Sequence, residues 1–91
     1  MLFTIPEKRL LYDRYFSIIR SDTTFFEIRS KNTGHYWIIK KMLSNTYKPI
    51  QVYHKHSYEV PYYHKHKSTI SVNNAISIIM EHDKFVLNLF V

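Results

Sequence analysis

The tetrapeptide Tyr-His-Lys-His occurs twice in this chain, at 53–56 and at 63–66. Each copy holds two histidines two residues apart, and in a β-strand such residues project from the same face. If the two copies form neighbouring strands of one hairpin, one patch gathers the four imidazoles of His54, His56, His64 and His66. Imidazole nitrogens are ligands for divalent transition metals, so we expect a metal site here, with zinc as its ion.

The pairing register of this hairpin decides whether the patch exists. With residues 57–61 as the loop, His54 faces His64. A shift by two residues keeps all four histidines together, whereas a slip by one residue separates them. Ile50 and Val52 precede His54 on the same face, which predicts that the histidines lie at the rim of the core. His35, on the preceding hairpin, is expected to lie outside this site.

Two other interpretations of the histidines stay open. They could form a cluster that responds to protons, because the unperturbed pKa of imidazole is near 6.5. They could also be ordinary packed or exposed side chains, since Lys55 and Lys65 alternate with them along the sequence. The sequence by itself does not decide between these readings.

The opposite face of the same hairpin combines aromatic and basic side chains. Rings can stack on nucleic-acid bases and ammonium groups can bind phosphates, so this face is a candidate partner surface. Its members are Tyr53, Lys55, Tyr63, Lys65 and Lys67, extended on the preceding hairpin by Arg29 and Lys31. The alternative is that the tyrosines only cover the sheet while the lysine stems lie along them.

Composition excludes several classes of protein. The chain has 91 residues and a formal net charge of +6, which favours a nucleic acid or a nucleic-acid-binding complex as partner. It has no cysteine, so any metal must be held by nitrogen and oxygen ligands. Its single glycine, Gly34, excludes glycine-rich phosphate loops. The few acidic residues are scattered, with no paired carboxylates and no Ser/His/Asp arrangement, so we predict that the protein is not an enzyme.

The ends of the chain give no sign of export or membrane insertion. The first residues lack a basic segment followed by a long apolar stretch. The longest apolar run, Phe85–Val91, is far shorter than the roughly 20 residues that span a bilayer. We therefore expect a soluble protein of the cytoplasm, in the interior of a host cell.

Hydrophobic periodicity predicts one α+β domain over residues 1–91, with an antiparallel sheet of about four strands packed against one or two helices. The expected order is α-β-β-β-β-α. The expected elements are a helix over Pro6–Arg20 (or a strand over Leu10–Ile19), strands at Phe25–Ser30, His35–Met42, Ile50–His56 and Tyr62–Lys67, a helix at Val72–His82, and a terminal strand or tail at Phe85–Val91. Of these, His35–Met42 is apolar on both faces and is predicted to be the central strand.

In general character the chain resembles the small accessory proteins of bacteriophages and mobile elements, a group that includes anti-CRISPR proteins. The resemblance lies in its size, its Ile-, Lys-, Asn- and Tyr-rich composition typical of AT-rich coding DNA, and its lack of a catalytic motif. It implies a non-enzymatic inhibitor, monomeric or homodimeric, that binds a nucleic-acid-processing complex or its nucleic acid. A metal-free DNA- or RNA-binding module is the alternative, and a ribonuclease toxin is the second alternative.

Overall fold

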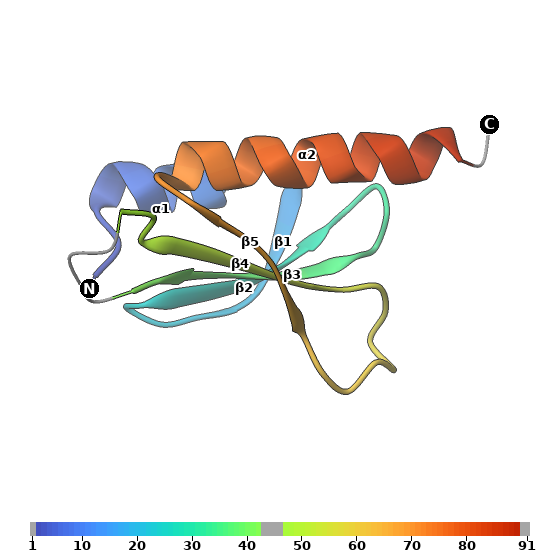
Figure 1. Ribbon diagram of the computed structural model, residues 1–91, viewed down its shortest axis with the longest axis horizontal. Helices are drawn as coiled ribbons and strands as arrows, with labels where there is room; N and C mark the ends of the chain where they lie inside the picture. The colour runs from blue at the N-terminus through green and yellow to red at the C-terminus, as the bar shows by residue number, and fades with distance from the viewer. Residues whose placement is uncertain (1, 43–46, 90–91) are drawn as a thin grey trace.

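Over residues 2–42 and 47–89, which the computed structural model describes, the chain forms a five-stranded antiparallel sheet and two helices (Figure 1). The strands lie in the sheet in their sequence order, so each pairs with the next along the chain. The elements are α1 (Ile5–Leu11), β1 (Phe16–Ser21), β2 (Phe25–Ser30), β3 (Tyr36–Lys41), β4 (Ile50–Lys55), β5 (His64–Thr69) and α2 (Val72–Asn88). The α+β class is confirmed, and β3 is the central strand, as predicted.

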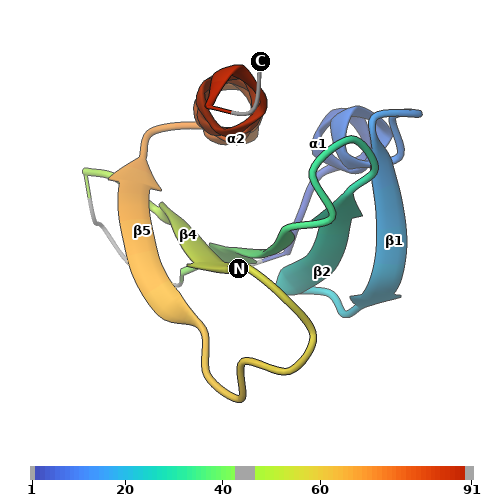
Figure 2. The ribbon, with the colours of Figure 1, turned by 90° about the vertical axis from the view of Figure 1, so that its right-hand side faces the viewer.

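The sheet is strongly curved and both helices lie on its concave side (Figure 2). We call this concave side the inner face and the convex side the outer face. Alternation along β4 buries Ile50, Val52 and His54 on the inner face and leaves the residues between them partly exposed. The buried core contains Trp37 and Ile39 of the sheet.

Helix α2 completes the core with one apolar stripe. Ser71 caps its first turn by accepting a hydrogen bond from the backbone N–H of Asn74. The buried positions follow at helical spacing and are Val72, Ala75, Ile76, Ile79 and Asp83. The stripe therefore continues one turn beyond the apolar residues and brings a carboxylate against the sheet.

The N-terminal helix is shorter than predicted, and this adds a strand. Thr4 and Glu7 form a capping box, but α1 ends at Leu11, so the prediction of a helix over Pro6–Arg20 is wrong beyond that point. Asp13 accepts a hydrogen bond from the backbone N–H of Tyr15, which turns the chain into β1. The β-favouring residues that follow pair with β2, and the sheet has five strands rather than about four.

The C-terminal prediction is also corrected. Residues 85–88 belong to α2 rather than to a terminal strand or tail, and the last two residues of the predicted Phe85–Val91 segment lie outside the described range. No glycine or proline follows His82 to end the helix, and Asp83 still faces the core. The helix therefore continues through Phe85 and Val86 despite their strand preference, although Phe85 is 63% exposed.

Candidate metal centre

His54 lies at the centre of the histidine cluster. It is buried on the inner face of β4, with 2% of its surface exposed. Its ring stacks on Trp37, the residue directly opposite on β3, at 4.1 Å between ring centroids and an interplanar angle of 28°. The register of β3 and β4 thus fixes the imidazole in a dry environment between the sheet and α2.

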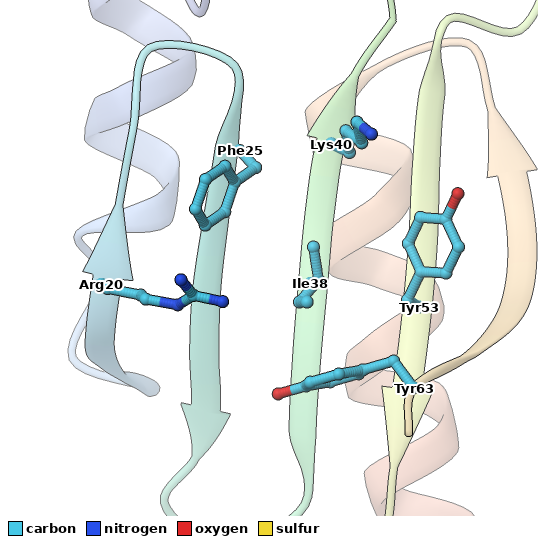
Figure 3. Close-up of a pocket in the computed structure, with 6 residues that line it drawn as sticks. All are labelled: Arg20, Phe25, Ile38, Lys40, Tyr53 and Tyr63. Carbon is cyan, nitrogen blue, oxygen red and sulfur yellow. The ribbon is translucent and has the colours of Figure 1, made fainter. Parts of the chain in front are cut away.

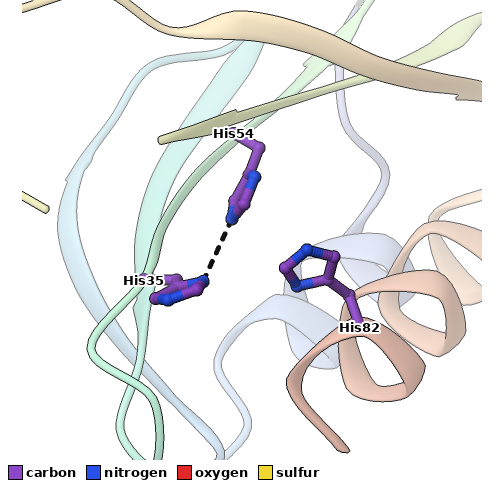
Figure 4. Close-up of side chains that lie close together, drawn as sticks. All are labelled: His35, His54 and His82. Atoms are coloured by element: carbon purple, nitrogen blue, oxygen red, sulfur yellow. Dashed lines mark hydrogen bonds between the residues drawn. The ribbon is translucent and has the colours of Figure 1, made fainter. Parts of the chain in front are cut away.

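Two further histidines approach His54 from other segments (Figure 4). His35, just before β3, places Nδ1 3.2 Å from Nε2 of His54. His82 projects from α2 toward the same point. One ring nitrogen from each of the three residues lies within 4.8 Å of the others, so His35, His54 and His82 are close enough together to hold a metal ion. We call these residues the histidine trio.

The spacing and the hydrogen bonding of the trio fit metal ligands. Zinc–nitrogen bonds of 2.0–2.1 Å in a tetrahedron separate two ligand nitrogens by about 3.3 Å. The nitrogens of His35 and His54 already lie at this separation. Among the described residues, Nδ1 of His82 is the one buried side-chain nitrogen or oxygen without a hydrogen-bond partner. Such an atom is costly to bury unless something binds it.

The surroundings of the trio favour neutral imidazoles. Burial, together with the neighbouring histidines, lowers the pKa of His54 to about 3. Burial is also the main cause that lowers the pKa values of His35 and His82, although the nearby Asp83 acts in the opposite direction. A metal binds the deprotonated ring, so at neutral pH the trio is ready to accept one.

Asp83 supports the trio from α2. Its carboxylate is fully buried and accepts hydrogen bonds from the hydroxyls of Tyr15, at 2.5 Å, and Thr33, at 3.0 Å. Burial and this carboxylate raise the pKa of Tyr15 to about 12. The hydroxyl oxygen of Thr33 also accepts from the backbone N–H of His35, at 3.2 Å. Asp83 therefore ties the β2–β3 turn to α2 and holds His35 in place through Thr33.

The other three histidines surround the trio. His56 stacks on His35 with ring centroids 4.8 Å apart and planes 8° apart, and His66 lies 5.4 Å from His82. His64 is directly opposite His54 on β5, as the predicted register requires, at 5.8 Å between centroids. All six histidines of the chain thus belong to one cluster.

The predicted ligand set and the observed trio overlap in one residue. The predicted patch of His54, His56, His64 and His66 exists on the inner face, at the rim of the core, but only His54 of these belongs to the trio. His35, which we expected outside the site, lies against His54. The sequence held a signal for His35: it lies two residues before Trp37, so in an extended segment both side chains project from the same face, the inner one. His82 comes three residues after Ile79, the last apolar residue of the stripe on α2. This helical spacing was the signal for the third residue of the trio.

A bulge in the hairpin changes the predicted partner surface. Val52 pairs with Lys67 and Tyr53 with Lys65, so His66 is an extra residue in β5. Residues directly opposite each other share a face, so Lys65 lies on the outer face with Tyr53, as predicted, but Lys67 lies on the inner side with Val52. The prediction that Lys67 belongs to the outer face is therefore wrong.

The remaining predicted partner residues lie in or beside the outer face. The ammonium group of Lys55 lies over three tyrosine rings, 5.4 Å from that of Tyr36, 5.8 Å from that of Tyr58 and 4.9 Å from that of Tyr63. Arg29 lies over the Tyr36 ring from the neighbouring strand, at 5.9 Å. The exposed Lys31 follows β2 in the turn. Much of the basic and aromatic character of this face is thus engaged in contacts within the chain.

Comparisons with other proteins add no family assignment. The chain matches no protein-family model, no curated protein and no solved structure. Within residues 2–42 and 47–89, no helix combines the length and the apolar content needed to cross a bilayer.

Proposed function

We propose that this chain is a non-enzymatic metal-binding protein in which a zinc ion, held by the histidine trio, fastens α2 to the sheet. The observation that carries the proposal is the convergence of His35, His54 and His82 from three separate elements, with Nδ1 of His82 buried and unpartnered. An ion bound there links the β2–β3 turn, β4 and α2. Its binding free energy adds to the stability of the fold.

Nitrogen ligands without thiolates suit zinc, nickel or copper(II). The separation of 3.2 Å between the His35 and His54 nitrogens is closer to the roughly 3.3 Å of a tetrahedral zinc site than to the roughly 2.9 Å that ligands at 90° would have. The buried carboxylate of Asp83 supports a cation at this place. Among the described residues, neither of the two ion pairs involves Asp83, and its hydrogen-bond donors are neutral hydroxyls. A divalent ion beside it would offset the cost of burying its charge.

A structural role for the ion is favoured over a catalytic one. A catalytic zinc keeps one position open for water or substrate, whereas a structural zinc has four protein ligands. His56 and His66 both lie beside the trio, with ring centroids 4.8 Å and 5.8 Å from that of His54. Either side chain is a candidate for the fourth ligand that would close the site.

For the biological role we propose an accessory inhibitor of the bacteriophage or mobile-element type, which binds a nucleic-acid-processing complex or its nucleic acid. The net charge of +6 supports this part of the proposal. A direct test is inhibition of a purified nuclease complex by zinc-loaded protein. In cells, expression of the chain should remove the host's protection against phage infection or plasmid entry.

The metal proposal is tested on protein purified without a histidine tag. We expect about one zinc per chain by elemental analysis and a melting temperature that falls on chelation. An ion at about 100 times its Kd adds roughly 2.7 kcal/mol, and each kcal/mol corresponds to roughly 4–8 °C for a domain of 60–100 residues. The fall should therefore exceed about 10 °C.

Three variants locate the site. His35→Ala and His82→Ala should lose the zinc and the effect of the chelator, while His64→Ala, a matched change of an exposed histidine in the same cluster, should keep both. Loss of zinc in His64→Ala with retention in His82→Ala would place the ion on the hairpin histidines instead. A protein without stoichiometric metal and with an unchanged melt would leave the His35–His54 contact as a hydrogen bond between two imidazoles.

A further inference from the structure

The outer face of the sheet holds a depression on the side opposite to the histidine cluster (Figure 3). Its volume is about 370 Å³, within the range of small-molecule sites. The lining comes from four strands and from the segment that leads into β5, and consists of Arg20, Phe25, Ile38, Lys40, Tyr53 and Tyr63. We call these six residues the outer pocket.

Its aromatic side chains form a floor and a wall. In Figure 3 the rings of Phe25 and Tyr53 lie on either side of β3, with their faces toward the viewer, while Tyr63 is seen edge-on and crosses β3 below Ile38. The Tyr63 hydroxyl donates a hydrogen bond to Oε2 of Glu27, at 2.8 Å, which fixes the wall. Two rings with accessible faces, Phe25 and Tyr53, beside the fixed ring of Tyr63 make a stacking platform for flat aromatic groups.

The charges at the rim are positive. Arg20 binds Oε1 of Glu27 through Nε, at 2.6 Å, and its guanidinium carbon lies over the Phe25 ring, 5.2 Å from the ring centroid. The side chain is still 65% exposed, so the guanidinium can meet an anion beside this ring. Both carboxylate oxygens of Glu27 are thereby engaged. Lys40 is exposed and takes part in neither of the ion pairs of the described residues. The pocket thus offers aromatic faces next to two cations.

We propose that the outer pocket binds single-stranded nucleic acid, with bases stacked on Phe25 and Tyr53 and with phosphates held by Arg20 and Lys40. A single strand fits because its bases are free to stack, whereas a duplex keeps its base faces inside. The inference deepens the nucleic-acid part of the proposed function and is independent of the metal centre, which lies on the inner face. Stacking uses the face of the base and does not read the sugar, so DNA and RNA single strands such as oligothymidine and oligouridine are expected to bind alike.

The test is fluorescence anisotropy with labelled oligothymidine, oligouridine and a duplex hairpin, using zinc-loaded protein at low salt. We expect both single strands to bind more tightly than the duplex. Phe25→Leu and Tyr53→Leu keep apolar bulk but remove a ring, and each should weaken single-strand binding at least about fivefold. Tyr62→Leu is the matched control, since Tyr62 is 80% exposed and does not line the pocket, and it should bind as the parent does.

A salt series measures the phosphate contacts. Lys40→Gln should reduce the slope of log K against log salt by about 0.7, the value for one phosphate contact with a single strand. Zinc content and melting temperature are measured on every variant, so a folding defect or a loss of metal is seen separately. Absence of binding by zinc-loaded protein, equal binding of the duplex, or unchanged binding by both ring variants would overturn the outer-pocket proposal. None of these results would contradict the proposal of a zinc ion at the histidine trio.

Discussion

Nδ1 of His35 lies 3.2 Å from Nε2 of His54, a contact between the end of the β2–β3 turn and strand β4. The contact exists because Trp37 pairs with His54, which sets His35 and His54 diagonally on the inner face. At this distance the two nitrogens either share one proton or flank one metal ion. The position of His82 above them, with a free Nδ1, favours the ion.

The stability of the metal-free protein should depend on pH in a direction set by these histidines. The pKa values of His35, His54, His66 and His82 are lowered in the folded state, chiefly by burial. As the pH falls through 6.5, the unfolded chain binds more protons than the folded one. The contribution of these histidines to stability is therefore fully present at higher pH and is lost as the pH drops. With a folded pKa of about 3, His54 alone should lower the free energy of unfolding by about 2 kcal/mol at pH 5. Melts of chelated protein between pH 8 and pH 5 measure this, and a flat profile would contradict the burial of His54.

The link from Asp83 through Thr33 to His35 should control metal affinity. Thr33→Val keeps the shape of the side chain but removes the hydroxyl that joins the carboxylate to the His35 backbone. Partners that orient ligands typically contribute 10–100-fold to metal affinity, so a loss of that size is expected in zinc titration. Thr24→Val, a change at a partly buried threonine away from the cluster, is the control and should retain the parent affinity. An equal affinity in both variants would mean that Thr33 does not position His35.

Gly34 should be hard to replace because its backbone is left-handed. Its φ is +75°, and an added Cβ would lie 3.1 Å from a terminal nitrogen of Arg29. Gly34→Ala should therefore lower the free energy of unfolding by about 1–2 kcal/mol, mainly through the backbone. Because His35 is the next residue, zinc affinity should fall as well. Chemical denaturation with and without zinc separates the two effects, and an unchanged unfolding midpoint would show that the turn relaxes without cost.

Trp37 should report on the metal centre. It is the single tryptophan, fully buried, and its ring stacks on His54 while its Nε1 donates to the hydroxyl of Ser30, at 3.1 Å. Zinc binding to His54 should change the emission of this indole, with a titration that ends near one equivalent. The His82→Ala variant should abolish the change, and a change that persists there would indicate zinc at another place.

The sequence by itself determined the α+β class, the central strand and the pairing of His54 with His64. These features follow from local patterns: alternation marks strands, helical spacing marks α2, and the repeated Tyr-His-Lys-His sets one hairpin register. They also indicated which residues of β3 and β4 share the inner face. Where local preferences conflicted, as in residues 10–21, the pattern did not decide between helix and strand, and pairing of β1 with β2 did.

Only the tertiary structure decided which histidines meet. His35, His54 and His82 are far apart along the chain, and they converge because α2 crosses the concave sheet and the β2–β3 turn is held to it by Asp83. The bulge at His66 likewise sends Lys67 to the inner side, since one extra residue reverses the alternation that the sequence implies. Such contacts depend on packing between elements and on sheet curvature, which no local periodicity encodes.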